Sequence, residues 1–129
     1  MAIASQQRTS APTSVVARKY WNVVRVPFAD LVARQGSNVV ARALDVSNSQ
    51  PSRWLKGTET PSPESAGKIS DLINVMTQLS LVWVDEIAHR WLFAPNAHLG
   101  GRVPVEVFKL EGAAPLLLAI RAEAAGAYA

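Results

Sequence analysis

Residues 91–104, WLFAPNAHLGGRVP, constrain the fold of this chain most strongly. A helical apolar pattern runs up to this stretch, and Pro95 ends that helix because proline removes a backbone donor and clashes with the preceding turn. The pair Gly100 and Gly101 redirects the backbone, and Pro104 suits the first turn of another helix. The stretch therefore predicts a shaped corner between two helices, with packing alone as the simplest role.

Size and composition indicate one small globular domain, or two very small ones that share a core. The chain has 129 residues, of which 49% are apolar and 18% charged, and this is typical of a packed protein. It contains no cysteine, which excludes disulfides and thiolate zinc sites. No apolar run approaches the length of a membrane span and residues 1–14 do not resemble a secretory signal, so we expect a soluble, cytoplasmic protein without membrane contact.

Charge is divided unevenly along the chain. Residues 1–57 hold eight basic and two acidic side chains, whereas residues 58–129 hold five basic and eight acidic ones. A basic half suits a polyanion such as nucleic acid, and a mildly acidic, apolar half suits contact with protein. A chance asymmetry of an ordinary solvated surface is the alternative.

The first segment, residues 1–26, is predicted to be a flexible basic arm followed by a lead-in. Residues 1–14 are rich in small and polar side chains and cannot bury enough surface to become ordered. Residues 15–26 are apolar with interspersed basic side chains, so they suit a short helix or a strand equally well.

A helix-turn-helix is predicted for the second segment, residues 27–62. Pro27 opens a first helix that Gly36 ends, Ser37 or Asn38 caps a second helix, and Ser49 caps a third. The spacing fits DNA-reading motifs, in which Ala41 allows a close crossing, Val46 fills the turn and Trp54 anchors the third helix. Asp45 stands where glycine is usual, because the chain adopts a left-handed conformation there.

Residues 49–56 would then form the recognition helix. Gln50 and Arg53 suit base edges, whereas Ser47, Asn48 and Lys56 suit phosphate. A three-helix scaffold that no longer touches DNA remains the alternative. The predicted DNA-binding residues are Ser47, Asn48, Ser49, Gln50, Ser52, Arg53 and Lys56.

The third segment, residues 63–129, follows a rigid connector, TETPSP, with Ser62 as N-cap and Pro63 in the first helical turn. An apolar face at three- and four-residue spacing then runs up to the corner, and we interpret it as core and partly as an interface between copies. Beyond Pro104 we expect two short helices separated at Gly112. Gly126 should stop the last helix, and residues 126–129 form a tail that is either frayed or a plug.

Catalytic motifs are absent from the sequence. Asp85, Glu86 and His89 have a metal-like spacing, but the second motif that a dinuclear site needs is missing, so an ion pair or a cap is the better account. No nucleophile elbow, P-loop or dinucleotide fingerprint occurs. We therefore expect no enzyme activity, cofactor or metal; a rival enzyme would have to use His89 with Asp85 or Glu86.

The string from Ala88 to Pro104, AxxWLxxPNxxLGGxxP, resembles the toxin-binding domain of antitoxins of the Xre/MbcA/ParS type. The preceding helix-turn-helix also resembles their layout, so the similarity extends from about residue 27 to the end. The resemblance implies an all-α chain whose partner is a RES-domain toxin that depletes NAD⁺. It also implies that the antitoxin obstructs the entrance of the toxin's active site and represses its own operon.

Carried over by position, the resemblance places structural residues in the corner and toxin contacts in the last helix and the tail. Tyr128 could stack where a base or nicotinamide lies, and Arg121 could add a charged contact. The predicted toxin-binding residues are Trp91, Asn96, Arg102, Leu117, Arg121, Gly126, Ala127, Tyr128 and Ala129.

We therefore predict a type II antitoxin that occludes a RES-domain toxin and binds operator DNA, as a homodimer and in a larger assembly with the toxin. The alternative is a stand-alone helix-turn-helix regulator whose C-terminal half only dimerises.

Overall fold

The computed structural model describes the backbone of residues 2–127 and the side chains of residues 18–126. The described backbone is all-α, as predicted, and forms no strand; its one isolated bridge joins Asn96 and Arg102. The elements are α1 (Ala2–Gln35), α2 (Ser37–Leu44), α3 (Gln50–Lys56), α4 (Pro63–Ser80), α5 (Asp85–Phe93), the 3-10 turn η1 (Ala97–Leu99), α6 (Pro104–Glu111) and α7 (Ala114–Ala127).

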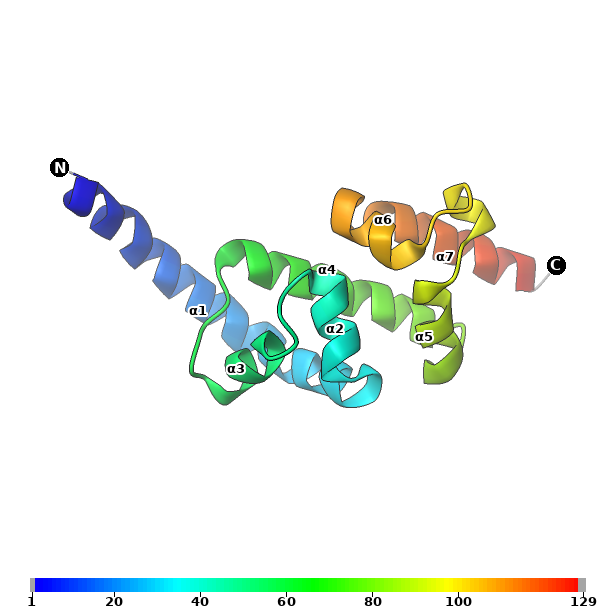
Figure 1. The fold of residues 1–129 in the computed structure, drawn as a ribbon, viewed down its shortest axis with the longest axis horizontal. Coiled ribbons are helices and arrows are strands. Elements are labelled where there is room, and N and C mark those ends of the chain that lie inside the picture. Colours follow the sequence, from blue (N-terminus) through cyan, green and yellow to red (C-terminus); the bar gives the residue numbers. More distant parts are fainter. Residues whose placement is uncertain (1, 128–129) are drawn as a thin grey trace.

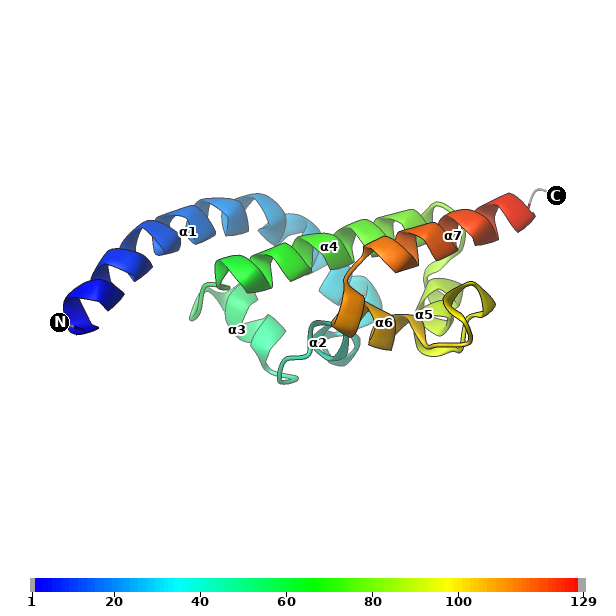
Figure 2. The same cartoon turned by 90° about the horizontal axis from the view of Figure 1, so that it is seen from above.

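The molecule is elongated, with α4 as its central helix. The second half of α1 lies along α4 (Figure 1), and α2 and α3 pack on one side of these two helices, below α4 in Figure 2. Helices α5, α6 and α7 pack over the C-terminal half of α4. The first half of α1 extends beyond the rest of the fold. The basic helix-turn-helix and the corner at residues 91–104 therefore lie in different parts of the molecule.

One continuous core joins these parts. Phe28 is fully buried, with its ring 5.5 Å from that of Trp21 and 6.2 Å from that of Trp54, both in edge-on arrangements. The predicted apolar face of α4 is confirmed, since Ile69 and Leu79 are buried in the same cluster. The domain boundary predicted at residue 62 coincides with the start of α4. It does not divide the core into two, because the buried cluster includes residues before and after this position.

The N-terminal segment differs from the prediction. The stretch expected to be a loose arm is helical from Ala2, residues 15–26 adopt the helical alternative, and Pro27 lies inside α1. Around Pro27 the reason lies in Trp21, Val24 and Phe28, because their spacing gives one buried face that continues across the proline. An exposed proline removes a single hydrogen bond from the helix, and burial of this face offsets the loss. The predicted boundary at residues 26 and 27 consequently falls within a helix.

Candidate functional site

The turn between α2 and α3 has the geometry of a helix-turn-helix. Asp45 is left-handed, with φ 58° and ψ 48°, which confirms the conformation predicted at this position. The Val46 N–H donates to the Ala41 carbonyl at 3.0 Å and closes the turn. Ala41 is fully buried where α2 is crossed, and Trp54 anchors α3 against Phe28. Local sequence thus fixes how α3 is held against the core.

One predicted cap is wrong, and a second is present without its side-chain bond. Gly36, with φ 91°, is the N-cap of α2 in place of Ser37 or Asn38, because the sharp reversal after α1 needs a positive φ. Ser49 is the N-cap residue of α3, as predicted, but makes no side-chain capping bond. Its hydroxyl accepts a hydrogen bond from Arg53 instead, so this serine belongs to the surface network of α3.

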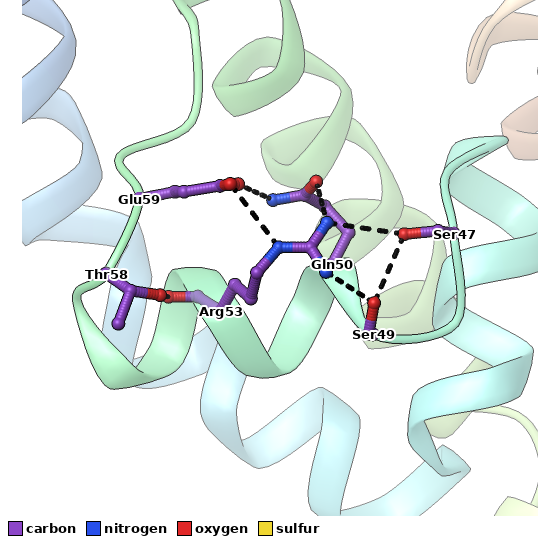
Figure 3. A network of polar contacts seen from close by, with 6 residues as sticks. All are labelled: Ser47, Ser49, Gln50, Arg53, Thr58 and Glu59. Carbon is purple, nitrogen blue, oxygen red and sulfur yellow. Dashed lines mark hydrogen bonds and ion pairs between the residues drawn. The ribbon is translucent and has the colours of Figure 1, made fainter.

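That network centres on Arg53 (Figure 3). One guanidinium nitrogen donates to Ser49, and the other lies 2.7 Å from Gln50 Oε1 and 3.4 Å from Ser47 Oγ. Glu59, from the loop after α3, faces the same group: its Oε1 lies 3.4 Å from Arg53 Nε, and its Oε2 accepts from Gln50 Nε2 at 2.5 Å. The two side chains best suited to read bases are therefore joined by one carboxylate.

Electrostatics favour the charged form of Glu59. The hydrogen bond from Gln50, together with the nearby charge of Arg53, lowers the pKa of the Glu59 carboxyl, although partial desolvation opposes the shift. Glu59 is not among the residues predicted from the sequence. Its position just beyond α3, in a chain with few acidic residues before it, was the only available signal.

All seven predicted DNA-binding residues lie at or near the surface around α3. Ser47, Asn48, Ser49 and Lys56 are exposed, and Gln50, Ser52 and Arg53 are partly exposed. Asn48 is anchored by its backbone, since its carbonyl accepts from the Ser37 hydroxyl at 3.1 Å. The structure thus brings these residues onto one compact polar surface.

The corner at residues 91–104 is built from the inside by Asn96. Its Oδ1 accepts from the His98 N–H at 2.8 Å, and its Nδ2 donates to Glu123 Oε1 at 3.1 Å, which ties the corner to α7. Its own backbone pairs with Arg102 and with the Gly101 N–H. Gly100 and Gly101 both have positive φ, as their predicted role requires. Helix α5 ends just before Pro95, and Pro104 begins α6.

Two residues predicted to contact a toxin are buried, which corrects that assignment. Trp91 is 9% and Asn96 6% exposed, so both stabilise the fold and neither presents its side chain to a partner. Arg102 is more accessible, but its guanidinium donates to the Leu99 carbonyl and pairs with Glu111. An aromatic and an amide side chain are common in protein interfaces, but here the packing of the corner against α7 buries both of them.

A groove between α4 and α7 contains two other predicted contacts. Leu117 and Arg121 line it, opposite Gln78 and Leu81, and the groove encloses about 440 Å³. Leu81 is 73% exposed at its edge. Gly126 does not stop α7, which continues to Ala127; the helical backbone at Gly126 has no positive φ, so the predicted stop was wrong. Tyr128 and Ala129 lie outside the described residues.

The acidic residues near His89 form no metal centre. His89 packs on Phe93, with ring centroids 5.1 Å apart, and Asp85 lies 3.9 Å from an Arg34 nitrogen. Within the part of the chain that the structure describes, no cluster of three or more potential ligands is present. None of the helices in that same part has the length and hydropathy to cross a bilayer.

Comparisons with known proteins agree with this architecture. Residues 78–119, from the end of α4 into α7, match the family described as the antitoxin Xre/MbcA/ParS C-terminal toxin-binding domain. The fold is similar to a chain in the crystal structure of the M. tuberculosis MbcT–MbcA toxin–antitoxin complex, with a TM-score of 0.69 and 25% identity over 81% of this chain and 96% of that one. Curated proteins give no match. Residues 78–119 therefore carry the C-terminal toxin-binding domain of this family, and the two comparisons together support an MbcA-type antitoxin.

Proposed function

We propose that this antitoxin neutralises a RES-domain, NAD⁺-degrading toxin by covering the entrance of its active site. The observation that carries the proposal is the position of α7, which begins inside the matched toxin-binding region and whose second half runs outward from the body of the molecule (Figures 1 and 2). A helix that projects in this way is able to enter a cleft in another protein. The similar M. tuberculosis chain comes from a toxin–antitoxin complex.

The surface around α7 has the character of a protein interface. The groove beside it combines apolar walls with the exposed guanidinium of Arg121. Nearby, Leu81, directly after α4, is 73% exposed, and Leu118 on α7 is 64% exposed. Stable interfaces depend on a few apolar or arginine anchors surrounded by less critical contacts. Occlusion requires such a surface and no reacting group from this chain, so we propose that it acts without catalysis or cofactor.

Co-expression tests this mechanism. The toxin encoded beside this chain should deplete cellular NAD⁺ when expressed alone, and the full-length antitoxin should preserve NAD⁺ and growth. A chain lacking residues 126–129 should remain folded but protect less well. If the truncated chain protects as fully as the intact one, the tail is not the plug. If the neighbouring toxin stays harmful with the intact antitoxin, occlusion itself is wrong.

We also propose that a homodimer of this chain, alone or with its toxin, binds operator DNA through α3. The helix-turn-helix geometry and the exposed polar surface at residues 47–56 support this role. Changing Arg53 and Lys56 together to Ala should weaken operator binding and flatten its dependence on salt, while neutralisation of the toxin is retained. An electrophoretic shift identical to that of the wild type would contradict α3 as the recognition helix.

A further inference from the structure

Glu59 lies where a DNA-binding surface would be expected to carry positive charge. It belongs to the loop between α3 and α4, yet its carboxylate faces back onto α3 and contacts both Gln50 and Arg53 (Figure 3). Carboxylate and phosphate oxygens compete for the same donors, because both are anionic acceptors with similar geometry. A negative charge at this position therefore opposes the approach of a polyanion.

The terminal N–H donors of Arg53 are engaged by other side chains of the same chain. Its two terminal nitrogens face Ser47, Ser49 and Gln50, and its Nε lies 3.4 Å from Glu59 without a hydrogen bond of good geometry. Arginine reads guanine with a fork of two parallel donors. These partners occupy three of the four N–H donors on the terminal nitrogens, so a contact that uses both terminal nitrogens on a base edge displaces at least one of them.

We propose that Glu59 is an intramolecular latch that holds Gln50 and Arg53 against the protein and competes with DNA for them. This inference rests on the proposed DNA-binding role of α3. DNA that offers only its phosphates to Arg53 has to break the Arg53–Glu59 ion pair and is also repelled by the negative charge of Glu59. A guanine edge offers two acceptors in the geometry of the arginine fork and replaces the contacts that are lost. The latch thus suppresses binding to arbitrary sequences.

Lys56 is the natural first contact in this scheme. It is exposed, lies one helical turn beyond Arg53, and takes part in no ion pair among the described side chains. A free cation beside a latched one allows an encounter with the DNA backbone to precede readout. In this scheme Lys56 attracts the DNA backbone, and Gln50 and Arg53 read the base edges.

The test measures binding of the full chain to a labelled duplex of mixed sequence over a range of salt concentrations. Glu59→Gln removes the charge and retains the shape, and Glu86→Gln on α5 is the matched control, because it changes the net charge equally at an exposed site away from α3. Freeing one cation corresponds to about one further phosphate contact, so the slope of log K against log[salt] should steepen by about 0.9. With equal affinities at 1 M salt, this steeper slope gives about an eightfold higher affinity than that of the wild type at 0.1 M salt.

Two further variants show whether Glu59 acts through Arg53. In an Arg53→Ala background, Glu59→Gln should gain much less, because no guanidinium remains to be released. Thermal unfolding of Glu59→Gln should match that of the wild type within the small range of surface changes. A gain in DNA binding without a change in unfolding temperature would assign the effect to the latch and not to altered folding.

The outcomes separate the latch from the DNA-binding role. If the wild type binds DNA and Glu59→Gln binds no better than Glu86→Gln, the latch is overturned and the recognition helix stands. If Glu59→Gln binds and the wild type does not, the latch is supported in its strongest form. If neither binds, the DNA-binding role fails and the latch fails with it.

Discussion

The turn before α3 and the turn within the corner at residues 91–104 both depend on a positive φ, but the polar side chains beside them have opposite roles. Around α3, Gln50 and Arg53 form a network on the surface. In the corner, Asn96 is buried and bonds to backbone and to Glu123. One connection leaves polar groups at the surface, and the other uses them to hold its own shape. The corner therefore supports the neighbouring α4–α7 groove without supplying contacts to it.

The largest expected effect that separates the two connections is on stability. Asn96→Ala removes a cap and leaves the partner atoms on His98 and Glu123 without hydrogen bonds, so it should lower the free energy of unfolding by about 2–3 kcal/mol. Gln50→Ala, in the surface network, should change it by less than about 0.5 kcal/mol. Urea unfolding of both variants measures the difference. Equal losses would mean that the surface network is as structural as the corner.

A second test asks whether the groove beside the corner receives the toxin. Arg121→Glu should weaken binding of the purified toxin about tenfold, or about 1.4 kcal/mol, because it reverses an exposed charge at the edge of the proposed interface. Arg90→Glu is the matched control, since Arg90 is exposed on α5 and does not line the groove. Titration calorimetry with the toxin measures both. A loss confined to Arg90→Glu would move the interface to α5.

Local rules predicted much of the fold. Pro63 and Pro104 begin helices, Gly112 ends α6, and Asp45 is left-handed, because each depends on backbone preferences within a few residues. The prediction failed where distant packing decides. Helix α1 continues through Pro27 because its buried face meets α4 and Trp54, which lie far along the chain.

The candidate sites show the same limit. Residue types and spacing were sufficient to place Gln50, Arg53 and Lys56 on one surface. They could not show that Trp91 is buried, since this depends on how the corner packs into the core. They also could not reveal Glu59, because its contacts cross a loop and depend on the path of the chain from α3 to α4.

A smaller effect should distinguish the roles of basic residues in the two regions. Lys56→Ala should reduce the slope of log K against log[salt] for DNA by about 0.9, because it removes one phosphate contact. Arg90→Ala on α5, at an exposed site away from α3, is the comparison, and it should leave the slope unchanged. Neither variant should alter toxin affinity. An equal change in both slopes would indicate a diffuse basic surface in place of a recognition helix.

The smallest expected effect concerns the backbone conformation that both connections share. Asp45 adopts φ 58°, in the region that Gly100 and Gly101 occupy in the corner, and an aspartate there is less favourable than glycine. Asp45→Gly should therefore raise the free energy of unfolding by about 0.5 kcal/mol, whereas Gly101→Ala should lower it by about 1 kcal/mol. Asp45→Asn removes the charge but keeps a side chain that tolerates this conformation. If Asp45→Asn stabilises the protein as much as Asp45→Gly does, relief of charge and not of backbone strain is the cause, and the two connections are less alike than their angles indicate.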